Sequence, residues 1–276
     1  MSTVTTVTAE DRIPGIRLSP VITLAQRRFQ LTVRTPRELF VPLLTPVLFA
    51  LVIAPALRSA LHTGAAYESF VALGTVGLLI PLNTMFSGLS VIVDRESGAQ
   101  RELLAAPVPR PLLVLGNLVV ALGATALQVG VLIAAARARG IDLAVSGTGV
   151  LWFLAAATLF AIGMYGMAET LASRMPKQEE YIARVPAIAI LPWFLAGALF
   201  PITALPGFLE WIARFLPLTH ALAVMRYGLR GDSSGLHAIW HMSDAAAMAG
   251  LSLAAIAAFA IVLTAASIRV FSRSRP

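Results

Sequence analysis

The stretch SFVALGTVGLLIPLNTMFSGLSVIV, residues Ser69–Val93, is 25 residues long and contains no charged side chain. A helix of about 20 residues is long enough to cross the hydrocarbon core of a bilayer, which is about 30 Å thick. A charge at the centre of such a helix costs roughly 2.5–3.5 kcal/mol on insertion, so charges are excluded from it. This stretch therefore predicts one membrane-spanning helix.

Five further intervals of the same kind lie on both sides of Ser69–Val93. They contain 19 to 26 residues each, and charged residues make up only 13% of the chain, against about a quarter in soluble domains. We therefore predict an all-α integral membrane protein with six transmembrane helices rather than a soluble helical core. The predicted spans cover about residues 39–58, 69–93, 111–136, 148–170, 185–202 and 245–268.

Basic residues are unevenly distributed among the segments that join these spans. With the amino terminus in the cytoplasm, 15 of the 21 basic residues fall on the cytoplasmic side and 6 on the outer side. The positive-inside rule therefore predicts that both termini are cytoplasmic, and we expect a multi-pass protein of the bacterial inner membrane. Contact with membrane lipids accounts for the net charge of +7 without a nucleic-acid partner. The absence of cysteine excludes disulfides and cysteine–zinc sites.

The two ends of the chain differ in composition from the membrane domain, which we place at residues 37–271. Residues 1–18 and 272–276 are expected to form flexible cytoplasmic tails. Residues 19–36 predict a basic amphipathic helix that lies on the inner membrane surface before the first span. Its apolar face consists of Ile22, Ala25, Phe29 and Val33. A solvated basic arm is the alternative interpretation.

Prolines divide the segment after the fifth predicted span into pieces that are too short to cross a membrane. They are Pro201, Pro206 and Pro217. On one piece Glu210 and Arg214 pair at i, i+4, opposite an apolar face that contains Trp211, a residue suited to the headgroup level. We predict short interfacial or re-entrant helices at the outer surface. Their apolar face is formed by Phe208, Trp211 and Phe215.

The segment DRESGAQRELLAAPVPR, residues Asp94–Arg110, follows Ser69–Val93 directly. It concentrates three acids and three bases between two uncharged intervals. By the predicted topology it is the first cytoplasmic loop. Residues 96–106 are able to form about three helical turns, which Pro107 ends. A helix with charged ends and small apolar residues between them suits docking on a soluble partner.

Residues suited to nucleotide hydrolysis or metal chemistry are sparse. A Walker A loop needs the pattern GxxxxGK[ST], and the only lysine, Lys177, lies in SRMPKQ without those glycines. We therefore expect no catalytic residue, no metal and no cofactor on this chain. His237, His241 and Asp244 share a helical face at a spacing that could hold a metal, but polar residues at an interface explain them more simply.

Few polar groups fall within the predicted spans. Asn83 and Asn117 are able to line a polar path, although hydrogen bonding between helices is the simpler interpretation. Glu169 lies near the cytoplasmic end of the fourth span, where it either marks an ion pathway or pairs with Arg174 as an interfacial acid. The role of Glu169 stays open at this point.

Three stretches resemble the type-2 permeases of ABC transporters, the drug- and polysaccharide-export class that includes the daunorubicin-resistance permeases. They are DRESGAQRELLAAPVPRPLLVLGNL, RTPRELFVPLLTPVLFALV and FPITALPGFLEWIARFLPLTHALAVMRYGLRG. The resemblance covers roughly residues 20–270, and the third stretch is the most specific. The chain departs from the family pattern at Ser97–Gln100, where a Gly-Thr pair is commoner.

The resemblance implies that the chain is the permease subunit of an exporter and is not itself an enzyme. In that family two six-span permease subunits, identical or related, join two separate ATPase subunits, which bind ATP and magnesium. The loop after the second span is then the coupling helix that sits on the ATPase. Its residues here are Arg95, Glu96, Gly98, Arg101, Glu102, Leu103, Leu104 and Pro107.

We expect an amphipathic drug- or lipid-like substrate, which moves along a lateral path between the permease subunits. Candidate path residues come from the second, third and fifth spans: Asn83, Met85, Phe86, Asn117, Trp193 and Phe194. Two other classes of protein stay open. An ATP-independent carrier or channel would need ion-coupling groups, and a membrane-embedded enzyme, such as a lipid-modifying transferase, would need clustered acids or histidines.

Overall fold

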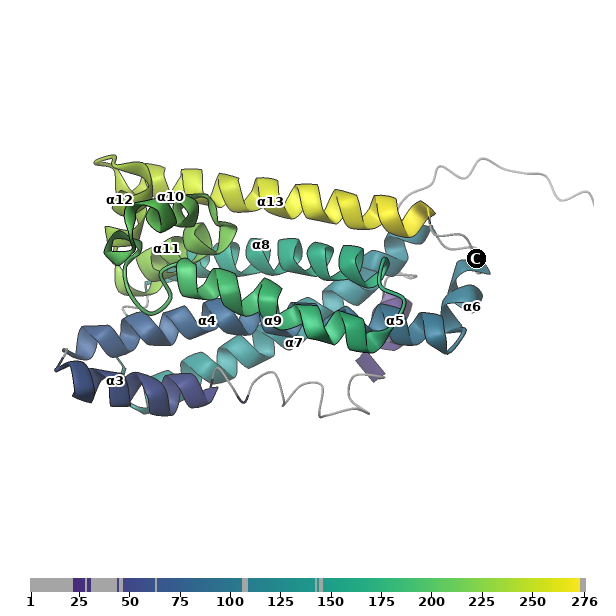
Figure 1. Cartoon of the computed structure of the whole chain (residues 1–276), viewed down its shortest axis with the longest axis horizontal. Coiled ribbons are helices and arrows are strands. Elements are labelled where there is room, and N and C mark those ends of the chain that lie inside the picture. Colours follow the sequence, from purple (N-terminus) through teal and green to yellow (C-terminus); the bar gives the residue numbers. More distant parts are fainter. Residues whose placement is uncertain are drawn as a thin grey trace, which may run out of the picture.

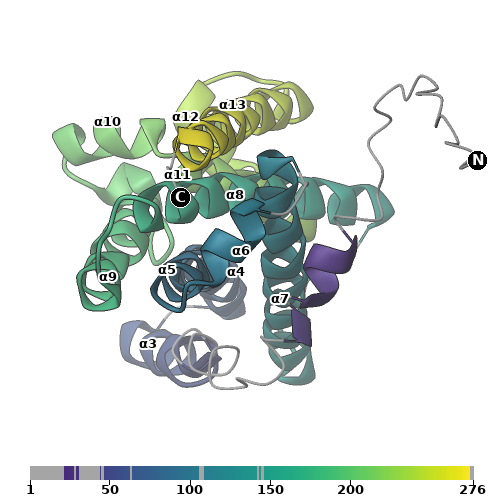
Figure 2. The same cartoon turned by 90° about the vertical axis from the view of Figure 1, so that its right-hand side faces the viewer.

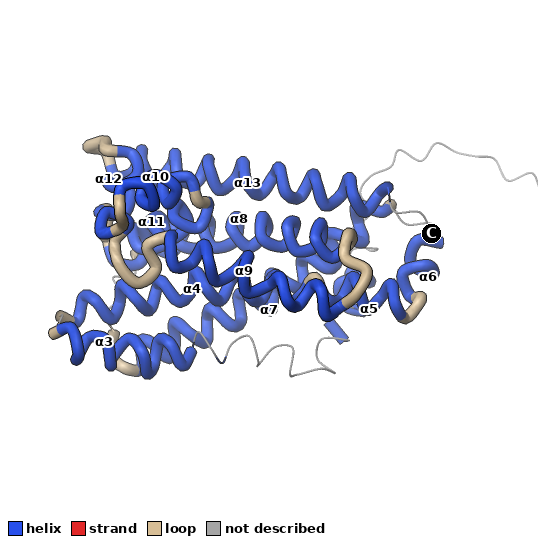
Figure 3. Tube along the Cα trace, viewed as in Figure 1, coloured by secondary structure: helices blue, strands red, loops and turns tan. Residues whose placement is uncertain are grey.

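The computed structural model describes the chain over most of its length, and the described elements are helices joined by loops (Figure 3). The described residues are 22–27, 29–30, 44, 47–62, 64–105, 109–141, 143 and 146–273. The prediction of an all-α protein is confirmed for this part of the chain. The tail predicted at 1–18, the last three residues of the tail predicted at 272–276, and Pro107 lie outside the described residues.

The longer helices lie side by side along the long axis of the molecule (Figure 1). They are α4 (Ala65–Ser87), α7 (Arg110–Ala138), α8 (Gly147–Ala172), α9 (Gln178–Leu195) and α13 (Ala245–Arg273). Helix α5 (Leu89–Glu96) continues α4 after a turn at Gly88. The end view in Figure 2 places α8 near the centre, with α7, α9 and α13 around it.

The shorter elements gather at the two ends of these helices. The π-helix η1 (Phe49–Ile53) and α3 (Ala54–Leu61) precede α4, and α6 (Ala99–Ala105) follows α5. Between α9 and α13 the chain forms η2 (Ile202–Ala204), α10 (Gly207–Phe215), α11 (Pro217–Arg230) and α12 (Ser234–Trp240). Figure 1 shows α10, α11 and α12 at one end of the bundle and α6 at the other.

The described residues contain four helices that are long and apolar enough to span a membrane. They are Ala66–Glu96, Pro111–Ala138, Gly147–Ala172 and Ala245–Phe271. The pair α10–α11, bent by 79°, adds a fifth if both helices form one broken span. The chain is thus a multi-pass membrane protein, with four or five candidate spans where the sequence predicted six.

Two predicted spans account for this difference. The first falls partly on residues outside the described ranges, and its described part is the short pair η1 and α3. The fifth corresponds to α9, whose 18 residues include Glu179, Glu180 and Arg184. Helix α9 ends at Leu195, before the predicted boundary at residue 202, because Gly197 takes a positive φ of 78° and turns the chain.

Close packing of α8 against α13 depends on two glycines of α8. A Cβ atom on Gly163 would lie 2.5 Å from the ring of Phe259, and one on Gly166 would lie 2.7 Å from the backbone of Leu263. Lipid supplies no hydrophobic drive between helices, so small residues that let backbones approach are what stabilises such a pair. Tight contact with α13 places α8 at the centre of the bundle.

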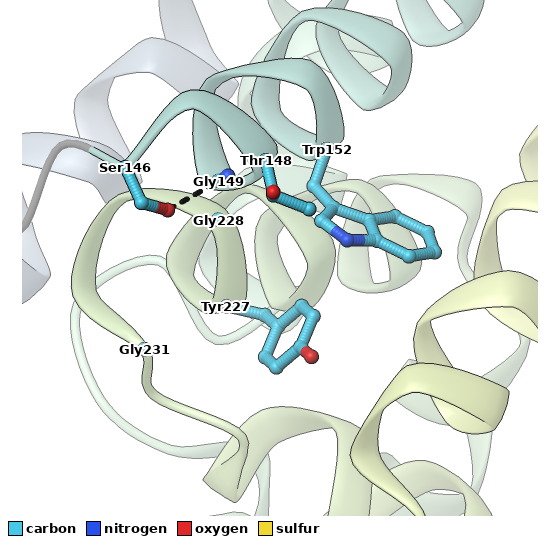
Figure 4. Close-up of a pocket in the computed structure, with 7 residues that line it drawn as sticks. All are labelled: Ser146, Thr148, Gly149, Trp152, Tyr227, Gly228 and Gly231. Carbon is cyan, nitrogen blue, oxygen red and sulfur yellow. Dashed lines mark hydrogen bonds between the residues drawn. The ribbon is translucent and has the colours of Figure 1, made fainter.

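A second close crossing joins the start of α8 to the end of α11 (Figure 4). The hydroxyl of Ser146 accepts a hydrogen bond from the Gly149 amide at 3.0 Å and caps α8. A Cβ on Gly149 would lie 2.0 Å from the carbonyl oxygen of Gly228. Trp152 and Tyr227 meet edge to face beside this crossing, with ring centroids 5.9 Å apart. The two backbones therefore touch directly.

Helices α10 and α11 differ sharply in burial. On α10 the predicted apolar face is exposed, with Phe208 at 72%, Trp211 at 60% and Phe215 at 68% of full exposure. Helix α11 lies inside the bundle, because every residue from Leu218 to Arg226 is buried. An interfacial position therefore fits α10 alone, and Arg226, which the charge count placed in an outer loop, is a buried residue.

Candidate coupling face

Helix α5 meets the connection between α8 and α9 at one end of the bundle, and α6 follows α5 at that end (Figure 1). We call this surface the α5–α6 face and define it as residues 94–105 together with residues 173–178. It contains the described members of the predicted coupling helix. The contacts below show how it is attached to the spanning helices.

Arg95 fastens α5 to the end of α8. Its guanidinium donates hydrogen bonds to the carbonyl oxygens of Ala172 at 3.3 Å, Pro176 at 3.3 Å and Met175. The last carbonyls of a helix lack partners within the helix, and the helix dipole makes that end favourable for a cation. Arg95 therefore caps α8 and joins the end of the second predicted span to the end of the fourth.

Further contacts attach α9 to the same place. The amide of Gln178 donates to the carboxylate of Glu96 at 2.6 Å. The buried hydroxyl of Tyr181 donates to the carbonyl oxygen of Met85 at 2.6 Å. A Cβ on Gly88 would lie only 2.3 Å from that hydroxyl, so the turn between α4 and α5 requires a glycine. A displacement of α5 would therefore also displace α9.

Helix α6 turns away from α5 at Gly98, whose φ of +80° is favourable for glycine and strained for other residues. Leu103 packs against a small cluster that includes Leu24, Leu113 and Phe271. Glu102 is exposed. Of the other predicted coupling residues, Arg101 and Leu104 belong to α6. Helix α6 is thus anchored on one side, with a charged residue at the surface.

The amino-terminal segment also contacts this end of the bundle. Residues 22–27 are helical, and Arg27 forms an ion pair with Asp94 at 3.7 Å. Leu24 lies against α7, where a Cβ on Gly116 would be 2.8 Å from it. Ile22 and Phe29, on the apolar face predicted for the interfacial helix, are 53% and 60% exposed. These exposed apolar side chains are free to meet the membrane surface.

Replacing Arg95 with methionine should loosen the α5–α6 face without unfolding the bundle. Methionine keeps the apolar stem but removes all three hydrogen bonds, and hydrogen bonds to charged groups contribute about 1.5–3 kcal/mol each. We expect faster amide hydrogen exchange in α6 and in residues 173–178. The matched control is Arg174→Met, because Arg174 is an exposed base in the connection between α8 and α9, to which Arg95 bonds. Equal exchange in both variants would contradict the assigned role of Arg95.

The residues of the predicted substrate path are not brought together on one surface. Asn83 is buried and donates to the Thr125 hydroxyl at 2.5 Å, as expected for a hydrogen bond between helices. Met85 is fully buried, and Trp193, 2% exposed, donates from its indole nitrogen to Gly74 O at 2.7 Å. Phe86 and Asn117 are half-buried, whereas Phe194 is 47% exposed. This conformation therefore contains no continuous path formed by all six residues.

Glu169 lies inside the helix bundle. It is fully buried, and its carboxylate accepts a hydrogen bond from the Ser267 hydroxyl of α13 at 3.2 Å. Arg174, the partner suggested by the simpler interpretation, is exposed. The contact with Ser267 makes Glu169 part of the tight α8–α13 packing.

The two histidines in and next to α12 contact backbone groups or end the helix. His237 donates from Nδ1 to the carbonyl oxygen of Ser233 at 2.9 Å, and His241 ends α12 with a φ of 54°. Asp244 accepts from the amides of Ala246 at 2.9 Å and Ala247 at 3.1 Å, which caps α13. Among the described residues no group of three metal-ligating side chains is found.

Arg226 is the buried charge that sequence reasoning did not single out. It donates to three carbonyl oxygens, those of Gly197 at 2.8 Å, Ala198 at 3.0 Å and Phe70 at 3.2 Å. Its guanidinium also lies 3.5 Å from the centroid of the Phe70 ring. One signal was present, because Arg226 is a lone base between apolar residues in ALAVMRYG.

The loop after α11 supplies an acid close to this site. Burial alone would raise the pKa of Asp232, but hydrogen bonds from Ser234 and the nearby Arg230 and Arg226 hold it below its usual range. Oδ2 of Asp232 lies 3.5 Å from Nη1 of Arg230. The carboxylate therefore stays charged and balances part of the positive charge at this end of the bundle.

Comparison with known proteins supports the resemblance found in the sequence. Residues 20–229 match the family of ABC-2 type transporters. The transport permease ycf38 of Porphyra purpurea is 26% identical over 209 residues, which cover 74% of this chain and 72% of that protein. The transport permease ycf38 of Pyropia yezoensis is 25% identical over 187 residues, covering 67% of this chain and 64% of that protein. The chain belongs to the ABC-2 type transporter family and is a membrane transport permease.

Proposed function

We propose that this chain is the permease subunit of an ABC exporter and that a separate ATPase subunit binds and hydrolyses ATP with magnesium. The observation that carries the proposal is the α5–α6 face. A short helix with an exposed acid, Glu102, follows the candidate span Ala66–Glu96, and Arg95 ties the end of that span to α8. The absence of a Walker A pattern from the sequence agrees with an ATPase on another chain.

The contacts of α5 suggest how movement of the ATPase reaches the membrane. A push on α6 is carried through the turn at Gly98 into α5 and from there into α4. Arg95 passes the same displacement to α8, and Glu96 passes it to α9 through Gln178. Packed helices that shift as rigid bodies are a common basis for switching between two states. The spanning helices would thereby alternate between inward-open and outward-open arrangements.

We assign the transported molecule to amphipathic drug-like or lipid-like compounds, moved out of the cytoplasm. Exposed apolar side chains lie on α9 and α10, such as Phe194 and Trp211. They favour a partly apolar substrate that moves along the boundary between the protein and the lipid. A second permease subunit, identical or related, would complete the pathway. We place the protein in the bacterial inner membrane with both termini and the α5–α6 face in the cytoplasm, in line with the positive-inside rule.

Cross-linking tests contact between the α5–α6 face and the ATPase. Because the chain has no cysteine, Glu102→Cys introduces a single thiol on the exposed side of α6. We expect a thiol-to-amine cross-linker to join this variant to a co-expressed ATPase subunit. Ser146→Cys is the control, since Ser146 is exposed at the start of α8, the opposite end of the bundle from α6. Equal cross-linking at both positions would contradict the proposed docking face.

The double variant Glu96→Ala/Leu104→Asp tests coupling itself. We expect it to release the ATPase on co-purification, or to leave ATP hydrolysis intact while transport in vesicles is lost. An unchanged complex and unchanged transport would remove the α5–α6 face from the mechanism. Transport without any ATPase would favour an ATP-independent carrier or channel instead.

A further inference from the structure

An apolar cavity of about 310 Å³, open on one side, lies between α4, α8, α9, α13 and the start of α11. Pro81 of α4, Met164 and Met167 of α8, and Ile188 and Ala189 of α9 form much of its wall. No charged side chain lines it. The wall is therefore suited to hydrocarbon and offers nothing to an ion.

The cavity exists because α9 packs against α4 and stands apart from α13 (Figure 2). Pro81 and Pro192 line the cavity within α4 and α9, and each removes a backbone donor from its helix. Pro217 adds a third proline at the bend between α10 and α11. Two prolines inside helices and one at the start of a helix thus surround one hollow.

An empty hollow of this size is unfavourable. Wall atoms that face a void lose their dispersion contacts, and the cost rises with cavity volume. The cavity is open on one side, and its wall includes residues of the candidate membrane spans that contain α4, α8 and α13. In a membrane, hydrocarbon from the bilayer can therefore enter the cavity and fill it.

The outer rim of the cavity has the chemistry of a lipid headgroup level. Leu216, in the bend that follows α10, lines the cavity. Two residues before it, Arg214 has a buried Nε donor with no hydrogen-bond partner, while its Nη2 donates to Glu210 at 2.6 Å. Trp211, on the same helix, is 60% exposed, and indole rings favour the membrane interface. A cationic side chain and an interfacial ring therefore belong to the helix that leads directly into the wall of the apolar hollow.

We infer that this cavity holds an acyl chain of a membrane phospholipid, with the phosphate of that lipid at the level of α10 beside Arg214. The lipid fills the gap between α9 and the α8–α13 pair and stabilises the bend between α10 and α11. Whether ATP drives transport has no bearing on this site, because its occupant is a component of the membrane itself.

Photolabelling tests the site directly. The probe is phosphatidylglycerol with a diazirine on its acyl chain, mixed into phosphatidylethanolamine vesicles that contain the purified protein. We expect labelled peptides from α8 around Met164 and Met167 and from α9 around Ile188. Ala189→Phe places a ring in the cavity and should lose most of this labelling. Ala187→Phe is the matched control, since Ala187 lies on the exposed side of the same helix.

Two further measurements keep the outcome interpretable. Met164→Trp fills the hollow from the α8 side and should lower labelling on α9 in the same way. Delipidation should lower the melting temperature of the wild-type protein more than that of Ala189→Phe, because a bound lipid stabilises the folded state. Equal labelling in the filled variants and Ala187→Phe would overturn the inference. Labelling that appears only during ATP turnover would assign the cavity to the transported molecule, and labelling that follows oligomer formation would assign it to a second copy.

Discussion

Replacing Gly149 with valine should prevent α8 and α11 from packing and leave little folded protein. The added Cβ would lie 2.0 Å from the carbonyl oxygen of Gly228, which is backbone and has no rotamer to change. Overpacking typically costs about 1–3 kcal/mol, and more where backbones have to move apart. Gly228→Val should act in the same way, since its Cβ would lie 2.4 Å from Gly149 O. The measurement is the yield and melting temperature of monodisperse protein in detergent.

Gly130→Val in α7 is the control for these two variants. Nothing lies within 4 Å of a Cβ on Gly130, and the residue is exposed. Valine has a higher helix propensity than glycine, so this variant should be as stable as the wild type or slightly more so. If Gly149→Val had the same melting temperature as Gly130→Val, the α8–α11 crossing would have to accommodate a side chain, which contradicts the close backbone contact described here.

Long uncharged intervals predicted α4, α7, α8 and α13 because a bilayer excludes charge over the length of a helix. The same rule failed to place the end of α9. Residues 185–209 are uncharged, but α9 begins at Gln178 and ends at Leu195, where Gly197 turns the chain. An uncharged stretch is equally compatible with a spanning helix and with a helix that ends inside protein. Charge alone therefore predicts where spans are possible and not where they stop.

The candidate site was predictable only in its local features. The acid–base cluster and Gly98 are visible in the sequence, and Gly98 does occupy a turn with positive φ. The partners of the cluster are not visible, since Arg95 bonds to carbonyls 77 to 81 residues away and Tyr181 reaches a carbonyl 96 residues away. Contacts to backbone oxygens leave no residue-type pattern, because every residue supplies the same acceptor.

Arg226 also shows why burial is hard to predict from a charge. Replacing it with methionine should destabilise the protein strongly, although methionine is the more apolar residue. Three carbonyl oxygens, of Gly197, Ala198 and Phe70, would lose their donor inside the bundle. Each buried polar group left unpaired costs about 1–3 kcal/mol; Phe70 O keeps its bond within α4, so Gly197 and Ala198 set a total of at least about 2 kcal/mol. Arg226→Lys should be intermediate, because one ammonium cannot reproduce the planar guanidinium fork.

Arg230→Met, one turn further along α11, separates this effect from loss of charge in general. Arg230 pairs with Asp232 at 3.5 Å near the end of the helix, and pairs that are partly open to solvent contribute about 1 kcal/mol or less. Thermal unfolding in detergent should therefore rank the proteins as wild type, Arg230→Met, Arg226→Lys and Arg226→Met in order of falling stability. If Arg226→Met melted no lower than Arg230→Met, the three carbonyls would have to find other donors. Arg226 would then be buried for a reason other than holding α11 to α4 and to the chain between α9 and η2.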